Sequence, residues 1–124
     1  MPHATCPPEE NVLRAIQTAH FDPERNRYSS ALFKGSSTSV SRLSISSIDE
    51  LFAVFHRELD CVIAAGEINV GTLQEIGRNF QSPVELTVLE NPTDSNPAHA
   101  VIPQKISKGL ARAIIRALRI HFDS

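Results

Sequence analysis

Residues 96–124 place a short apolar segment directly before the longest amphipathic pattern of the chain. The apolar segment, residues 98–102, lies between two prolines, which is typical of a short β-strand. After Ser107, a good N-cap residue, apolar side chains recur at the spacing of a helix. This spacing predicts a helix over residues 108–121 that buries Leu110, Ala111, Ile114, Ile115, Leu118 and Phe122. A strand and a helix that both need a covering layer favour a mixed architecture.

The same stretch carries the strongest charge asymmetry of the chain. Five of the twelve basic residues lie in it with no acid among them: Lys105, Lys108, Arg112, Arg116 and Arg119. Residues 1–104 hold seven basic and thirteen acidic residues, a formal charge of −6. This asymmetry favours a phosphate-bearing or acidic partner for the helix. The alternative is a solvated basic face with no partner.

A capping box marks a second helix. Ser47 and Glu50 have the spacing in which each side chain bonds the backbone N–H of the other. Behind them, apolar residues fall on one helical face that ends near Leu59. The sequence therefore predicts a helix over residues 48–59.

Several shorter segments indicate strands. Residues 38–43, 61–65, 84–90 and 98–102 have the pattern of strands, and residues 27–34 suggest another short one. A turn-rich loop joins 84–90 to 98–102, so we expect these two to pair antiparallel. Residues 70–76 predict a short helix. Residues 9–20 favour a helical turn over the alternative of an edge strand.

Length and order of these elements define the fold class. A chain of 124 residues fits one domain. We expect an α+β fold over residues 9–124, with one small, mostly antiparallel sheet packed by two amphipathic helices. Residues 1–8 contain three prolines and are expected to form a flexible N-terminal tail.

The remaining composition bears on location and cofactors. Cys6 and Cys61 lack metal-ligand spacing, and no paired histidine motif is present, so we expect no metal and no cofactor. No apolar run approaches a membrane span, and the N-terminus does not resemble a signal peptide. Two unpaired thiols favour the cytoplasm.

Candidate catalytic residues are few. His99 lies in an apolar strand, where a histidine is either a hydrogen-bonded structural residue or a general base at a strand edge. His20 and Asp22 flank a turn and would form a catalytic group only if they converge with His99. Further binding candidates are Arg27, Ser39 and Arg42, because residues 35–43 combine a glycine, hydroxyl groups and an arginine that suit a phosphate.

Four segments together resemble a family of small bacterial proteins to which no activity is attached. They are His20-Phe21-Asp22-Pro23, Ser29-Ser30-Ala31-Leu32-Phe33-Lys34, Ser39-Val40-Ser41-Arg42-Leu43 and Asn96-Pro97-Ala98-His99-Ala100-Val101-Ile102. The resemblance implies a bacterial origin, and it implies that the strands of Ser39 and His99 belong to the same structural unit.

The charge split and the absence of a catalytic motif in the sequence predict a binding or accessory module rather than an enzyme. Its basic helix would contact nucleic acid or an acidic protein. The alternative is a small enzyme or nucleotide-binding protein with a polar pocket around His99, His20 and residues 37–42. A third possibility is a homo-oligomer that shares an apolar face.

Overall fold

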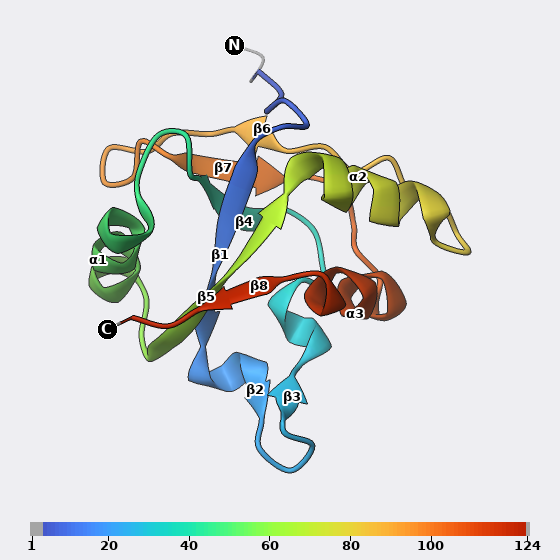
Figure 1. Ribbon diagram of the computed structural model, residues 1–124, viewed down its shortest axis with the longest axis horizontal. Coiled ribbons are helices and arrows are strands. Elements are labelled where there is room, and N and C mark those ends of the chain that lie inside the picture. Colours follow the sequence, from blue (N-terminus) through green and yellow to red (C-terminus); the bar gives the residue numbers. More distant parts are fainter. Residues whose placement is uncertain (1–3, 124) are drawn as a thin grey trace.

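The computed structural model describes residues 4–123 and contains a six-stranded antiparallel sheet with the strand order β6-β7-β4-β1-β5-β8 (Figure 1). The sheet strands are β1 (Asn11–Gln17), β4 (Thr38–Arg42), β5 (Val62–Asn69), β6 (Leu89–Glu90), β7 (His99–Ile102) and β8 (Arg119–His121). A separate hairpin consists of β2 (Phe21–Asp22) and β3 (Arg27–Tyr28). The helices are α1 (Ile48–Glu58), α2 (Val70–Asn79) and α3 (Lys108–Arg116), with 3-10 helices η1 (Thr18–His20) and η2 (Ser30–Leu32). The predicted α+β class is confirmed, with three α-helices where two were expected to pack.

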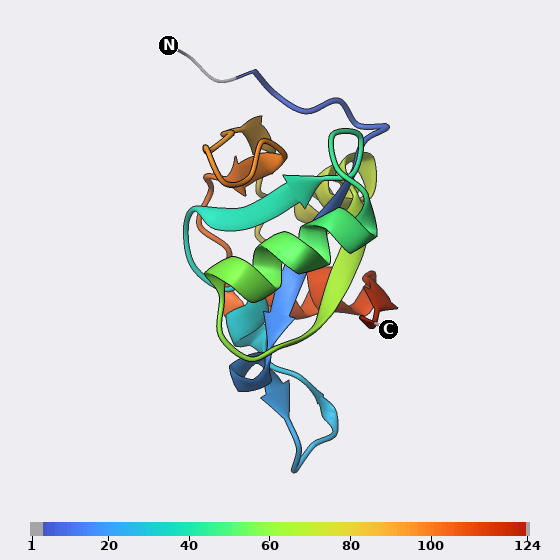
Figure 2. The same cartoon turned by 90° about the vertical axis from the view of Figure 1, so that its left-hand side faces the viewer.

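The helices cover both faces of the sheet. Helix α1 lies on one face, and α2 and α3 lie on the other (Figures 1 and 2). Because side chains of a strand alternate between faces, β1 contributes to two separate cores. Leu13 and Ala15 pack with α1, whereas Val12 and Ile16 belong to the larger core that includes residues of α2 and α3. The domain is therefore a three-layer structure with β1 at its centre.

The prediction of a helical turn in residues 9–20 is wrong, because residues 11–17 form β1. The alternative of an edge strand is right about the strand but wrong about the edge, since β1 pairs with β4 on one side and β5 on the other. Its apolar residues do not alternate with polar ones because both faces of the strand are buried. A short run that is apolar on both faces has no periodicity that separates a strand from a helix.

The C-terminal helix is shorter than predicted. Helix α3 ends at Arg116, and residues 119–121 form β8 against β5. This strand satisfies backbone groups at what would otherwise be an open edge of β5. Leu118 lies over Gly66 of β5, where an added Cβ would come within 2.8 Å of its Cδ1 atom. Phe122, expected in the buried stripe, is instead 71% exposed.

Two further segments differ from expectation. Only Leu89 and Glu90 of the predicted strand 84–90 are in the sheet. The predicted tail is docked from residue 4 onward: the backbone N–H of Cys6 donates to Val88 at 2.7 Å, and that of Glu90 donates to Ala4. The buried side chain of Cys6 fixes this segment. Residues 1–3 lie outside the described range.

Other local predictions are confirmed. The capping box at α1 has both bonds, with Glu50 N donating to Ser47 Oγ at 3.2 Å and Ser47 N donating to Glu50 Oε1 at 3.0 Å. Strand β4 matches the segment predicted at 38–43, and β6 pairs antiparallel with β7. The strand suggested for residues 27–34 is the exception and is wrong for most of its length, because only Arg27–Tyr28 form a strand, β3, and η2 follows it.

Within residues 4–123, no helix has the length and apolar character needed to cross a membrane.

The packing of α2 gives a test of the fold. A Cβ at Gly77 would lie 2.5 Å from the backbone oxygen of Val84. We expect Gly77→Ala to lower the free energy of unfolding by about 2 kcal/mol, because this clash outweighs the roughly 1 kcal/mol gain in helix propensity. Urea denaturation measures the difference. Gly109→Ala is the control, because its Cβ would meet only the movable ring of Phe80; equal loss in both variants would contradict the predicted packing.

Candidate functional site

A groove lies between the β2–β3 hairpin and α3. Its volume is about 460 Å³, within the range of ligand sites. We call it the arginine groove, and its lining residues are Phe21, Asn26, Arg27, Tyr28, Arg112, Ile115 and Arg116. Figure 1 shows the hairpin projecting from the body of the domain, with α3 beside the sheet above it.

The hairpin is held by its own turn. Asp22 Oδ1 accepts hydrogen bonds from the backbone N–H groups of Glu24 and Arg25, at 3.1 and 3.3 Å. Asn26 adopts a left-handed conformation with φ of 51°, which asparagine tolerates better than most residues. Asp22 therefore stabilises the hairpin turn, and its hydrogen bonds lie within that turn and do not involve His99.

Two aromatic rings form the hairpin side of the arginine groove. Phe21 and Tyr28 are directly opposite each other in β2 and β3. Their rings meet edge to face, with centroids 5.6 Å apart. Both side chains are only half-buried, so part of each remains accessible from the groove.

Three arginine residues line the same groove. Arg112 and Arg116 lie one turn apart on α3, with the apolar side chain of Ile115 beside them. Arg27 comes from the hairpin. Within residues 4–123, none of the three forms an ion pair with a carboxylate. The groove therefore concentrates uncompensated positive charge next to aromatic surface.

The other predicted basic residues are distributed differently. Lys108 is exposed one turn before Arg112 and extends the same helical face. Lys105 lies in the loop before α3, and neither it nor Arg119 lines the arginine groove. The predicted helical stripe through Arg119 is wrong because the helix ends first; Arg119 lies on β8 opposite Glu67.

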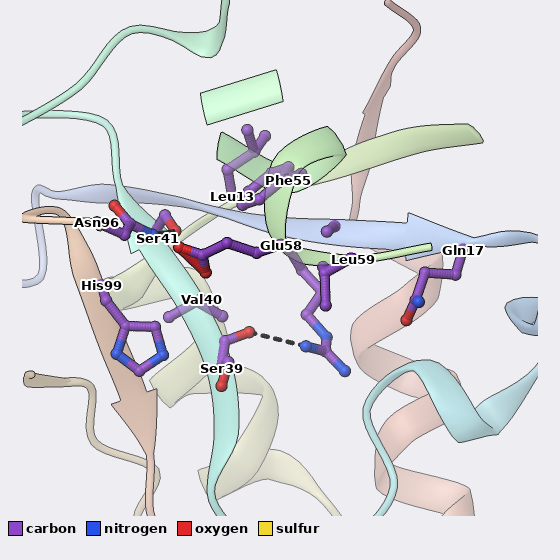
Figure 3. A pocket seen from close by; sticks show the side chains of 12 residues that line it. Leu13, Gln17, Ser39, Val40, Ser41, Phe55, Glu58, Leu59, Asn96 and His99 are labelled. Atoms are coloured by element: carbon purple, nitrogen blue, oxygen red, sulfur yellow. Dashed lines mark hydrogen bonds between the residues drawn. The ribbon is translucent and has the colours of Figure 1, made fainter. Parts of the chain in front are cut away.

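A second cavity lies on the face of the sheet that α1 covers in part (Figure 3). It measures about 180 Å³, and we call it the α1-face pocket. Its polar lining residues are Arg14, Gln17, Ser39, Ser41, Glu58, Asn96 and His99. Its apolar lining residues are Leu13, Ala15, Val40, Phe55 and Leu59.

His99 belongs to this pocket and is half-buried. Its Nδ1 atom lies 2.8 Å from the backbone oxygen of Asn91. A carbonyl oxygen only accepts, so Nδ1 carries a proton and donates it. In the neutral ring, Nε2 then presents an acceptor lone pair.

His20 does not join His99. Its Nδ1 accepts a hydrogen bond from the backbone N–H of Gln17 at 3.0 Å, so its proton is on Nε2. Burial, with a smaller contribution from the charge of Arg14, lowers the pKa of His20 and favours this neutral form. Neither His20 nor Asp22 lines the α1-face pocket, so the structure does not assemble His20, Asp22 and His99 into one catalytic group.

Arg42 forms hydrogen-bonded ion pairs within the fold and does not line either cavity. Its Nε and Nη2 donate to Glu10 Oε1 at 2.9 and 2.6 Å, and Nη1 donates to Glu90 at 3.3 Å. Burial raises the pKa of Glu10, but hydrogen bonds from Ser44 and Arg42 outweigh it and hold the pKa below its ordinary value. Of the secondary candidates, Arg27 therefore lines the arginine groove, Ser39 lines the α1-face pocket, and Arg42 is engaged by carboxylates.

Sequence reasoning missed the aromatic pair and Arg14. Phe21 and Tyr28 flank a predicted turn, and their near-symmetric placement about it was the available signal for a hairpin pair. Arg14 interrupts an apolar run in a segment interpreted as helical. Its position on a central strand, inside a pocket, follows only from the pairing of β1 with its neighbours.

Comparisons with family models, curated proteins and solved structures found no match to this chain. The resemblance to small bacterial proteins stays a prediction. Among residues 4–123, no group of three or more histidine, cysteine, aspartate or glutamate side chains is placed to hold a metal ion.

Substitution of Arg42 tests whether its ion pair with Glu10 stabilises the fold. Removing its charge in Arg42→Met leaves Glu10, whose side chain is 2% exposed, without its partner. We expect a loss of about 2–3 kcal/mol in the free energy of unfolding at neutral pH, measured by urea denaturation. Because the folded-state pKa of Glu10 is lowered, this stability is present above its unfolded pKa and is lost as pH falls through the folded value. A difference that does not shrink in acid would contradict this assignment.

Proposed function

We propose that the protein binds single-stranded nucleic acid through the arginine groove. The observation that carries this proposal is the convergence of Arg27, Arg112 and Arg116 with Phe21 and Tyr28 in one groove. Cations attract a phosphate backbone, and aromatic side chains stack on unpaired bases, so the combination is typical of single-strand binding.

The charge distribution supports a polyanion over a single phosphate. Lys108, Arg112 and Arg116 follow one another at four-residue intervals on α3, and Arg27 continues the positive surface onto the hairpin. Such a track contacts successive phosphates of an extended strand. Binding releases condensed counterions, which makes affinity depend on salt.

The aromatic pair distinguishes nucleic acid from an acidic protein. Carboxylates on a protein surface need only the cations, whereas a base offers a flat face to Phe21 or Tyr28. Duplex bases are already stacked, so the rings favour an unpaired strand. An acidic protein surface is the runner-up partner. Cys6 and Cys61 form no disulfide, which fits our proposal that the protein acts in the cytoplasm.

Charge reversal of the helix tests the electrostatic part. We expect Arg112→Glu with Arg116→Glu to weaken binding of a labelled single strand of about 20 nucleotides at least roughly tenfold. The slope of log affinity against log salt should fall by about 1.4, because each single-strand phosphate contact contributes about 0.7. Fluorescence anisotropy between about 50 and 200 mM salt measures both quantities.

The matched control reverses two exposed arginines outside the groove, in Arg57→Glu with Arg78→Glu. Its net charge change equals that of the groove variant. We expect it to retain most of the affinity and the salt slope. Equal weakening in both double variants, or no single-strand binding by the wild type, would refute the proposed site.

The aromatic part has its own test. Phe21→Leu keeps an apolar side chain but removes the ring that would stack on a base. We expect roughly tenfold weaker single-strand binding with an unchanged salt slope, since stacking releases no counterion. Duplex of the same length should be unaffected by the substitution. Unchanged single-strand affinity would instead favour an acidic protein as the partner.

A further inference from the structure

The α1-face pocket shares no residue with the arginine groove, and its chemistry is different. One cation, Arg14, and one carboxylate, Glu58, line it together with apolar side chains from β1, β4 and α1. We propose that this pocket binds a small zwitterion of the α-amino acid class, with the carboxylate of the ligand on Arg14 and its ammonium group on Glu58. The proposal is independent of nucleic-acid binding.

Backbone carbonyl groups fix the orientation of the Arg14 side chain and leave part of its guanidinium group available to an anion. Its Nε donates to the backbone oxygen of Leu32 at 3.0 Å, and its Nη1 donates to that of Ser39 at 3.0 Å, marked by the dashed line in Figure 3. Strands β1 and β4 pair only as far as Leu13 and Ser41. Beyond that point the two strands no longer pair, and the backbone carbonyl of Ser39 accepts a hydrogen bond from the Arg14 side chain instead of from a backbone N–H of β1.

These bonds orient the guanidinium group without neutralising it. Within residues 4–123, Arg14 forms no ion pair, and its Nη2 atom has no hydrogen-bond partner. No side-chain nitrogen or oxygen in this part of the chain is both buried and unpartnered, so Nη2 retains contact with solvent. Desolvation of the group lowers the pKa of Arg14, and an anion would offset that loss of hydration.

Glu58 supplies the opposite charge. It comes from the last residue of α1, and its Oε1 accepts a hydrogen bond from Ser95 at 2.5 Å. Figure 3 shows its side chain reaching from the helix toward Ser41, with His99 and Ser39 on the same side of the sheet. The second carboxylate oxygen has no partner within residues 4–123, so it is available to an ammonium group. The Nε2 lone pair of His99 is a further acceptor.

The size and walls of the pocket limit the ligand. Its volume of about 180 Å³ is below the roughly 300–1,000 Å³ of typical ligand sites and favours a small ligand such as an amino acid. Among the apolar lining residues, Leu59 is 38% exposed and can contact an aliphatic side chain, whereas Leu13, Val40 and Phe55 form the buried wall behind it.

Isothermal titration calorimetry of the full chain with alanine, valine and leucine tests the proposal, at ligand concentrations up to about 10 mM. Each amino acid is compared with the carboxylic acid that lacks its ammonium group and with the amine that lacks its carboxylate. We expect saturable one-to-one binding of at least one amino acid. Both truncated analogues should bind at least roughly tenfold more weakly, because each leaves one charged group of the pocket unmatched.

Substitutions connect the binding to the pocket. Glu58→Gln changes an exposed side chain and should weaken amino-acid binding roughly tenfold while leaving the carboxylic-acid analogue unaffected. Asp60→Asn is the matched control, because it removes an equal charge from a nearby exposed side chain that does not line the pocket. Arg14→Lys should weaken both the amino acid and the carboxylic acid, with thermal unfolding used to verify that the variant is folded.

Three results would overturn the proposal. The first is no binding of any of the three amino acids at about 10 mM. The second is equal affinity for an amino acid and its carboxylic-acid analogue, which would remove the role of Glu58. The third is an equal effect of Glu58→Gln and Asp60→Asn, which would place the ligand elsewhere on the surface.

Discussion

Burial of β1 on both faces is the constraint on which the rest of the structure depends. Leu13 and Ala15 need α1 as their cover, and Val12 and Ile16 need the layer formed by α2 and α3. A single strand therefore determines that helices lie on both sides of the sheet. The two candidate sites share no residue: the α1-face pocket lies where β1 and β4 cease to pair beside α1, whereas the arginine groove includes residues of α3.

The sequence predicted elements whose signals are local. The capping box of α1 involves Ser47 and Glu50, three residues apart, and it appears in the structure with both bonds. The antiparallel pair β6–β7 followed from one turn-rich loop. Elements that depend on distant partners were missed. Strand β1 lacks polar alternation because both its faces are buried, and β8 exists because β5 offers it an edge.

The candidate sites show the same division. Arg112 and Arg116 were found because a helix spacing is visible in one short segment. Their combination with Phe21 and Tyr28 could not be predicted, because nothing in the spacing of residues 21–28 and 112–116 indicates that they meet. The alternative of a catalytic group required His20 and Asp22 to lie beside His99, and neither of them lines the pocket of His99. The chemistry of these side chains did not indicate where the fold would place them.

The immediate partners of each arginine decide its role. Arg42 forms ion pairs with the carboxylates of Glu10 and Glu90, so its charge is neutralised within the fold. Arg14 has backbone carbonyls instead, which fix its orientation but leave a net charge at a pocket wall. Within residues 4–123, the side chain of Arg112 bonds neither a carboxylate nor a backbone carbonyl, so its charge can attract an anion from solution. Ion pairing within the fold assigns Arg42 to stability, and the lack of a carboxylate partner is why we propose ligand-binding roles for Arg14 and Arg112.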